Sequence, residues 1–182
     1  MKKGTIIALG IASCISLTMA GSVTSILMHR NVAVSMEESI NAQYTYNKSN
    51  YDYMIKTAKE SVQVTDMYAE DFERIYKELI EGRNKDTNLL FKVVQESNPQ
   101  LDASVYKELQ RTIASNRKIF DKNQGMLTDK IREYNTYIKK KFIMSAITKR
   151  TPMDAEKFIV TSQSTQDVFN TGIDEEINLR GE

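Results

Sequence analysis

Two long segments of this chain alternate apolar and polar residues with the three-and-four spacing of an amphipathic helix. The first runs from about Val34 to Ile80 and contains neither glycine nor proline. The second starts near Asp102 to Ser104 and runs to about Ile147. Helices of such length bury their stripes best against each other, so we expect antiparallel packing at a shallow angle. The expected seam positions are Ile40, Tyr44, Tyr51, Met54, Ala58, Val62, Ala69, Phe72, Tyr76 and Leu79 in the first helix, and Val105, Leu109, Ile113, Asn116, Phe120, Asn123, Leu127, Ile131, Tyr134 and Ile138 in the second.

The chain is expected to reverse between these helices. Gly82 stands where a helix C-cap would lie, and polar residues follow it. LLFKVVQESNP, residues 89 to 99, predicts a short helix that ends before Pro99, because the residue before proline is disfavoured in the helical region. Gly125, inside the second helix, costs about 1 kcal/mol relative to alanine, which a close backbone approach or a bend would explain.

A further short helix is predicted near the C-terminal end. In TPMD, residues 151 to 154, threonine can cap a helix and proline fits the first helical position. Residues 155 to 161 would form this helix, and the polar stretch from 162 to 182 is expected to be irregular. The predicted body is therefore an elongated antiparallel bundle with short helices at the hairpin and at the C-terminus.

Residues 4 to 28 differ from the rest because they contain no charged side chain. As a helix they would cover about 37 Å, more than the roughly 30 Å of a hydrocarbon core. We predict a single transmembrane helix in an all-α, membrane-associated protein. Lys2 and Lys3 precede the segment and Arg30 follows it, so the positive-inside rule slightly favours an extracytoplasmic body.

Two other fates of this segment stay open. Cleavage of a signal peptide after Ala20 is one, although apolar residues continue beyond that position. IASC, residues 11 to 14, resembles a bacterial lipoprotein box, in which Cys14 would be acylated. The apolar run before Cys14 is short and the run after it is long, which favours an uncleaved anchor.

Composition narrows the function classes. The 182 residues include only 7 glycines and 2 prolines, as expected for long helices. A net charge of +1 gives no basic footprint for nucleic acid. The one cysteine, Cys14, and the one histidine, His29, both lie within or beside the apolar segment, which excludes a Cys/His zinc cluster and a Cys-His dyad. No glycine-rich phosphate loop is present. We expect no cofactor and no small-molecule substrate.

Polar residues within the seams are the first candidate positions. Asn47, Asn116 and Asn123 interrupt the apolar stripes, and buried asparagines commonly fix helix register and partner choice. Four tyrosines between residues 44 and 53 suit an interface, although two of them also occupy seam positions. A carboxylate site is the enzymatic alternative, and its candidates are Glu70, Asp71, Asp129 and Glu133.

The second long segment resembles a known family. VYKELQRTIASNRKIFDKNQGMLTDKIREYN, residues 105 to 135, preceded by VVQESNPQLD, is similar to the LemA family, with the strongest resemblance over residues 93 to 147. The positions that carry it are Glu96, Pro99, Leu109, Gln110, Asn116, Arg117, Phe120, Gln124, Leu127, Asp129, Arg132, Tyr134 and Asn135. The resemblance implies a membrane helix followed by an elongated antiparallel bundle, and no established catalytic residues. It adds Arg117, Gln124, Asp129, Tyr134 and Asn135 to the candidate register or interaction positions.

The functional expectation is a non-enzymatic, single-pass scaffold or interaction protein. It would have an anchor (1–30), a helical bundle (31–161) and a polar tail (162–182), with protein partners or self-association. A component of a larger assembly or a phage-encoded particle is the structural alternative. The basic run Lys139–Lys141 suits a helix C-terminus, and an antiparallel return would bring it toward the membrane-proximal end, where lipid headgroups or a partner could meet it.

Overall fold

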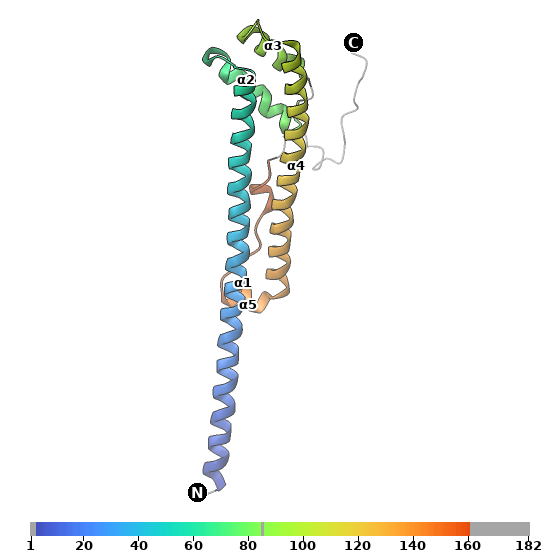
Figure 1. The fold of residues 1–182 in the computed structure, drawn as a ribbon. Coiled ribbons are helices and arrows are strands. Elements are labelled where there is room, and N and C mark those ends of the chain that lie inside the picture. Colours follow the sequence, from blue (N-terminus) through green and yellow to red (C-terminus); the bar gives the residue numbers. More distant parts are fainter. Residues whose placement is uncertain (1–2, 85, 161–182) are drawn as a thin grey trace, which may run out of the picture. The chain divides into compact units, whose positions relative to one another are not determined.

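The computed structural model describes residues 3–84 and 86–160. These residues form helices and connecting turns and contain no strand, which confirms the all-α prediction. The helices, shown in Figure 1, are α1 (Lys3–Ser61), α2 (Asp66–Ile80), α3 (Asn88–Ser97), α4 (Ala103–Lys140), α5 (Phe142–Ile147) and a 3-10 turn, η1 (Ala155–Lys157). The chain divides into two compact units, Met1–Ala42 with Thr128–Ala155 (unit 1) and Gln43–Leu127 with Glu156–Glu182 (unit 2).

The N-terminal part of α1, in unit 1, is apolar and exposed. This helix is long and apolar enough to cross a membrane, as predicted for residues 4 to 28. None of its most apolar window is buried within the protein. The large apolar side chains that are at least half exposed here are Ile7, Leu9, Ile11, Ile15, Leu17, Met19, Val23, Leu27 and Met28.

The same helix becomes packed from about residue 29 onward. Ser39, at the far end of unit 1, accepts a hydrogen bond from Lys130, whereas His29 lies against Tyr137. Residue numbers in α1 therefore rise as those in α4 fall, so the two helices run antiparallel within unit 1. Ala33, Ile40, Ile131, Tyr134 and Ile138 are its buried apolar and aromatic residues.

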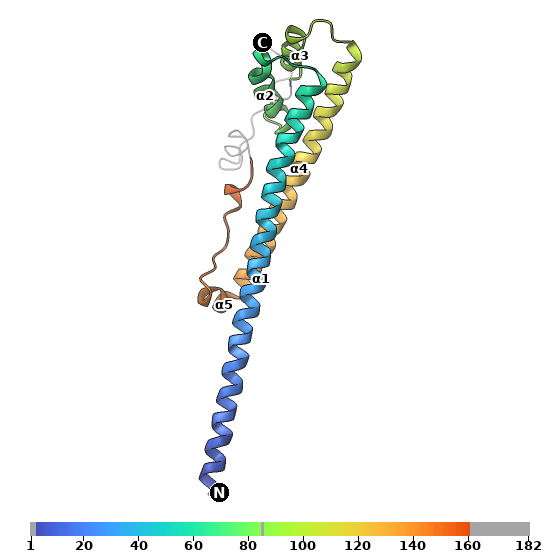
Figure 2. The ribbon, with the colours of Figure 1, turned by 60° about the vertical axis from the view of Figure 1, so that its left-hand side comes forward.

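Unit 2 is built on a hairpin between α1 and α2 that the sequence did not predict. The expected continuous helix from Val34 to Ile80 is wrong, because α1 ends at Ser61 and α2 begins at Asp66. The two helices run antiparallel, since Lys59 lies 3.1 Å from Glu73. Folding back buries the apolar stripe of α2 against the end of α1 and against α3, which lies beside α2 (Figure 2). The buried cluster comprises Ile55, Ala58, Val62, Phe72, Ile75, Tyr76, Leu79, Ile80, Leu90, Val94, Leu109 and Ile113.

A Schellman motif makes the turn between α1 and α2. Gln63 adopts the left-handed conformation with φ of 53°. Its backbone N–H donates to the Glu60 carbonyl at 3.1 Å, and the Val64 N–H donates to the Lys59 carbonyl at 3.3 Å. These two bonds satisfy the last carbonyls of α1 in the pattern usually made with glycine at the left-handed position. The end of α2 fulfils the prediction for Gly82, which has φ of 77° and donates to the Leu79 carbonyl.

The second long helix is shorter than predicted, because α4 ends at Lys140 and not at Ile147. Lys141 leaves the helical region, with φ of −107° and ψ of 38°, and α5 follows as a separate turn and a half. The Ser145 hydroxyl donates to the Ile138 carbonyl at 3.0 Å, which satisfies a carbonyl released by the bend. The start of α4 was predicted correctly, since the Asp102 carboxylate caps it by accepting the Ser104 N–H at 2.7 Å.

The predicted C-terminal helix over 155 to 161 is wrong for the residues described. Only η1 forms, and Pro152 lies in an extended approach to it. The backbone of Met153 is held by a side chain of α4 and is therefore not available for a helical turn. Thr161 and the predicted polar tail, 162 to 182, lie outside the described residues.

The seams were predicted well in the burial of individual residues. Ile40, Met54, Ala58, Val62, Phe72, Tyr76 and Leu79 are buried, as are Leu109, Ile113, Phe120, Asn123, Leu127, Ile131, Tyr134 and Ile138. Tyr44 is the main exception, because its side chain is 44% exposed. Gly125 has nothing within 4 Å of the position its Cβ would occupy, so close backbone approach does not explain it.

Candidate functional site

A partly buried ion pair with a tyrosine stands at the centre of the polar contacts in unit 1. Arg150 lies 2.9 Å from Glu37, and both side chains are largely covered. The Tyr134 hydroxyl donates to the same carboxylate at 2.8 Å. Burial, with the hydrogen bond to Glu37, raises the pKa of Tyr134 to about 12. The tyrosine therefore stays protonated and acts as a donor that holds three segments of the chain together.

Asn135 binds a backbone, not a ligand. Its side-chain amide donates to the Met153 carbonyl at 2.7 Å, and its carbonyl oxygen accepts the Met153 N–H at 2.7 Å. One side chain thus satisfies both polar groups of a residue 18 positions away. The contacts of Tyr134 and Asn135 tie the C-terminal segment to α4.

His29 marks the end of the exposed apolar segment and is itself buried. Its Nδ1 lies 3.0 Å from the Tyr137 hydroxyl, and its Nε2 lies 3.3 Å from the Ser145 hydroxyl. The Tyr137 ring stacks on the imidazole with ring centroids 5.0 Å apart. Burial lowers the pKa of His29, and the nearby cations Arg150 and Lys141 lower it further.

The seam asparagines of unit 2 form a chain of amides. Asn47 accepts a hydrogen bond from Gln43 at 2.8 Å and donates to the backbone carbonyl of Asn123 at 2.9 Å. The Asn123 side chain in turn donates to Asn50 at 3.1 Å. These bonds join α1 to α4 at one level, as expected for residues that fix helix register.

Asn116 and Arg117 both bind the end of α2. The Asn116 amide donates to the Tyr76 hydroxyl at 2.8 Å. Arg117 donates from Nε to the Leu79 carbonyl at 2.9 Å and from Nη2 to the Asn84 carbonyl at 3.2 Å. A cationic fork at these carbonyls also suits the negative end of the helix dipole.

A cavity of about 300 Å³ opens between α1, α4 and the segment after η1, all within unit 2. Its aromatic walls include Tyr44, whose ring meets Phe158 edge-on with centroids 5.8 Å apart. The polar wall contains Glu81, which accepts the Tyr51 hydroxyl and pairs with Arg83. Burial, reinforced by Glu81, raises the pKa of Tyr51. The full lining is Tyr44, Asn47, Lys48, Tyr51, Glu81, Phe120, Gln124, Phe158 and Val160.

Two of the candidate register or interaction positions, Asn47 and Gln124, therefore line this cavity. The Gln124 side-chain oxygen also accepts the Val160 N–H at 3.3 Å. An apolar cavity with a few convergent polar groups is the usual form of a site that accepts a small molecule or one large side chain.

The remaining predicted positions are on the surface. Asp129 pairs with Arg132 one turn away, with both side chains more than half exposed. Glu70, Asp71 and Glu133 are exposed as well, and Asp71 pairs with Arg74. Among residues 3–84 and 86–160, no three or more His, Cys, Asp or Glu side chains lie close enough to hold a metal ion. Cys14 is exposed on the apolar part of α1.

Sequence reasoning missed Glu37, Gln43, Glu81 and Arg150. Glu37 and Arg150 are 113 positions apart, and no local pattern pairs them. Gln43 carried a usable signal, because it lies one helical turn before Asn47 on the same face of α1.

Comparisons with known proteins identify no relative of this chain. No protein-family model matches it, and neither the curated proteins nor the solved structures include a significant match.

Proposed function

We propose that this chain is a single-pass membrane protein whose helical body serves as a LemA-like scaffold for protein partners and carries out no catalysis. In this proposal residues 4 to 28 cross the bilayer and α1 and α4 form an elongated antiparallel bundle. The observation that carries it is the exposure of nine large apolar side chains along one uninterrupted helix that then packs against α4.

The exposed apolar helix supports membrane insertion on energetic grounds. Removing a Leu, Ile, Val or Met side chain from water gains about 1.5–3 kcal/mol, so nine such residues in water would be strongly unfavourable. Unit 1 buries none of them, whereas a hydrocarbon core would bury all of them. The helix also satisfies its own backbone, as a membrane span requires.

The resemblance to the LemA family agrees with this arrangement at several positions. Residues that carry it include Arg117, Tyr134 and Asn135, and each binds another segment of the chain. Their contacts hold separate segments of the chain together, which supports a structural role for the shared pattern.

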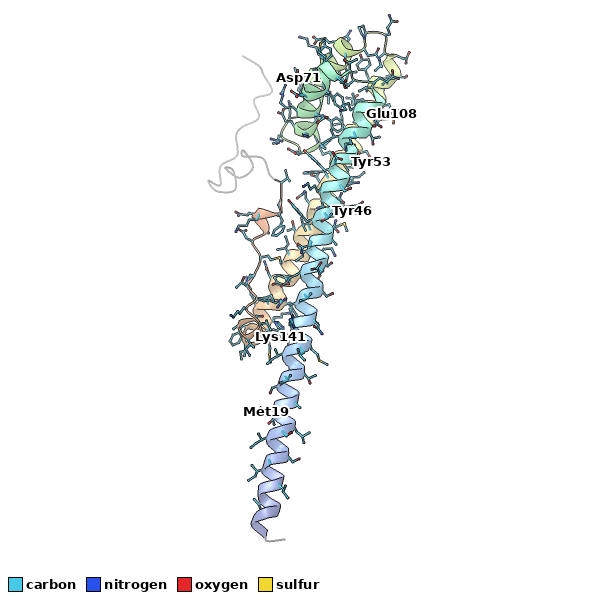
Figure 3. The ribbon with its side chains drawn as sticks, turned by 90° about the vertical axis from the view of Figure 1, so that its left-hand side faces the viewer. Met19, Tyr46, Tyr53, Asp71, Glu108 and Lys141 are labelled. Atoms are coloured by element: carbon cyan, nitrogen blue, oxygen red, sulfur yellow. The ribbon has the colours of Figure 1, made fainter. Side chains whose placement is uncertain are left out.

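The proposed partner surface lies in unit 2. Tyr46 and Tyr53 are 55% and 66% exposed and lie seven residues apart on one face of α1, so they do not fill the seam. Figure 3 labels Tyr46 and Tyr53 on α1. Tyrosine is enriched at protein interfaces because it offers a large apolar body with a polar end. The cavity, which Tyr44 and Tyr51 line, lies on the opposite side of α1 and is separate from this surface.

Membrane attachment is tested by alkaline carbonate extraction of membranes from cells that express the full chain with a C-terminal tag. The proposal expects the tagged protein in the pellet, both for the natural sequence and for Cys14→Ser. Fatty-acid labelling that disappears in Cys14→Ser would establish the lipoprotein instead. Protease protection of the tag in spheroplasts then assigns the side of the membrane that holds the body.

The interaction role is tested by photocrosslinking in intact membranes. A photoreactive phenylalanine analogue replaces Tyr46 or Tyr53, and Glu108, whose side chain is 69% exposed on α4, is the matched control. Discrete crosslinked products at the tyrosine positions and none at Glu108 are expected. Equal crosslinking at all three positions would contradict a specific partner surface.

A further inference from the structure

The short helix α5 lies where the exposed apolar part of α1 ends. Its Ser145 hydroxyl is 3.3 Å from His29, the residue that directly follows the apolar segment. Figures 1 and 2 both show α5 beside α1 at this level. In Figure 3, Lys141 at the start of α5 lies beside α1, and Met19 lies further along the apolar part of the helix. If residues 4 to 28 cross a bilayer, α5 is therefore at the level of the membrane surface.

The outward face of α5 is apolar. Phe142, Ile143 and Ile147 are 69%, 58% and 54% exposed, and Ala146 is exposed as well. At 100° per residue these four positions occupy one continuous arc of the helix. Ser145, the polar residue of the helix, is instead buried toward His29 and Ile138. This orientation is the reverse of that of a helix whose outer face meets water.

Cations surround this apolar face. Lys139, Lys140 and Lys141 directly precede α5, Lys149 follows it, and Arg30 lies next to His29. All five are exposed. Neither residues 29 to 36 nor residues 138 to 150 contain an aspartate or a glutamate. The charge is thus concentrated at one end of unit 1, although the whole chain has a net charge of only +1.

We infer that α5 is an interfacial helix, with Phe142, Ile143 and Ile147 inserted at the headgroup–acyl boundary and Lys139–Lys141 bound to the phosphates of anionic lipids. This inference rests on the proposed membrane anchor and extends it to a second, lateral contact with the same bilayer. Apolar residues flanked by lysines are the combination that binds an anionic membrane surface. Continuity with the apolar part of α1 favours lipid over a soluble protein as the occupant of this face.

The chain contains no tryptophan, so single-tryptophan variants can report depth in the bilayer. Full-length Phe142→Trp, Ile147→Trp, Leu17→Trp and Asp129→Trp are reconstituted in nanodiscs of phosphatidylcholine and phosphatidylglycerol. Each sample contains lipid brominated either near the carbonyl end or near the chain terminus. Asp129 is the matched exposed control, about 18 Å from Lys141 along α4.

We expect Phe142→Trp and Ile147→Trp to be quenched several times more strongly by the shallow bromines than Asp129→Trp, with blue-shifted emission. Leu17→Trp should be quenched most by the deep bromines. Quenching at Leu17 with none at Phe142 and Ile147 would overturn the interfacial helix and leave the anchor intact. No quenching at Leu17 would overturn the anchor itself.

The lysines are tested on the Phe142→Trp background. Replacing Lys139, Lys140 and Lys141 by glutamine should abolish the increase in quenching that phosphatidylglycerol produces over phosphatidylcholine alone. The matched control replaces Lys107, Lys118 and Lys122, which are exposed lysines of α4 in unit 2. Equal losses in the two triple variants would show a general charge effect and contradict lysine–headgroup contacts at α5.

Discussion

At the scale of single residues, long-range polar contacts join segments of unit 1 that its apolar seam does not. Asn135 is the clearest case, because one amide replaces two backbone hydrogen bonds for Met153. A helix pattern predicts that a residue beside Tyr134 is near the seam, but not that it binds the backbone of the segment that follows α5. Met153, which Asn135 binds 18 positions later in the chain, carries no sequence pattern that would predict this contact.

Asn135→Ala should free both polar groups of Met153 and lower the free energy of unfolding of the body by about 1–3 kcal/mol. Hydrogen exchange should show the Met153 amide losing its protection while seam amides of α4 keep theirs. Glu133→Ala, an exposed change on the same helix, is the control and should leave exchange unaltered. Retained protection at Met153 in the Asn135 variant would contradict the assignment.

His29 should titrate below its ordinary pKa of 6.5, because burial and the cations Arg150 and Lys141 disfavour its protonated form. Between the folded pKa and about 6.5 the unfolded chain binds more protons, so the free energy of unfolding rises with pH in this window. Stability is thus full above about pH 6.5 and decreases as the pH falls below that value.

NMR of the single imidazole measures the pKa of His29 directly, since the chain contains one histidine. Unfolding measured between pH 5 and 8 should show the loss at low pH in the natural sequence and a smaller slope in His29→Gln. An unshifted imidazole would contradict the buried environment.

At the scale of helices, the sequence predicted the long helical segments and α3, but not where the long segments break, and it wrongly predicted a helix over 155 to 161. The start of α4, the whole of α3 and the end of α2 at Gly82 follow from capping residues and from Pro99. The breaks after Ser61 and Lys140 do not, because no glycine or proline marks them. At both places tertiary packing outweighs local propensity: burial of Val62 supports the first turn, and buried Ser145 supports the second.

Gln63 and Gly82 both have positive φ, so substitutions at these two positions test how backbone conformation affects stability. Gln63→Gly should stabilise the body by up to about 1 kcal/mol, because glycine adopts positive φ without steric cost. Gly82→Ala should destabilise it by about 1–2 kcal/mol for the opposite reason. Denaturant unfolding of the body measures both changes in the free energy of unfolding.

Gly125→Ala is the companion control, because this glycine lies within a helix and an added Cβ meets nothing. It should stabilise the body by about 1 kcal/mol through helix propensity alone. Stabilisation by Gly82→Ala would contradict the left-handed conformation of Gly82 at the end of α2.

At the scale of the whole molecule, the proposed membrane anchor predicts that the apolar segment holds the protein in the membrane. Ile15 and Leu17 lie near the centre of residues 4 to 28, and both are exposed. An arginine at the centre of a membrane helix costs about 3 kcal/mol, so Ile15→Arg with Leu17→Arg should remove the chain from the carbonate-resistant pellet. Phenylalanine at both positions is the control and should keep the chain there. If the arginine variant pellets to the same extent as the phenylalanine control, insertion of this segment is contradicted.

Helix α1 continues without interruption from its apolar segment into the segment that packs against α4. The helix has no break or linker there. An insertion at this point therefore changes both the distance of the packed residues from residue 28 along the helix axis and the direction in which they point. A single residue inserted between Met28 and His29 would raise the packed part of unit 1 by about 1.5 Å and turn it by about 100°. Seven inserted residues would raise it by about 10 Å and nearly restore the original direction. If residues 4 to 28 cross a bilayer, an insertion here changes the distance of the packed part of unit 1 from the membrane, and it also turns the side that this part presents to its neighbours unless it adds whole helical turns.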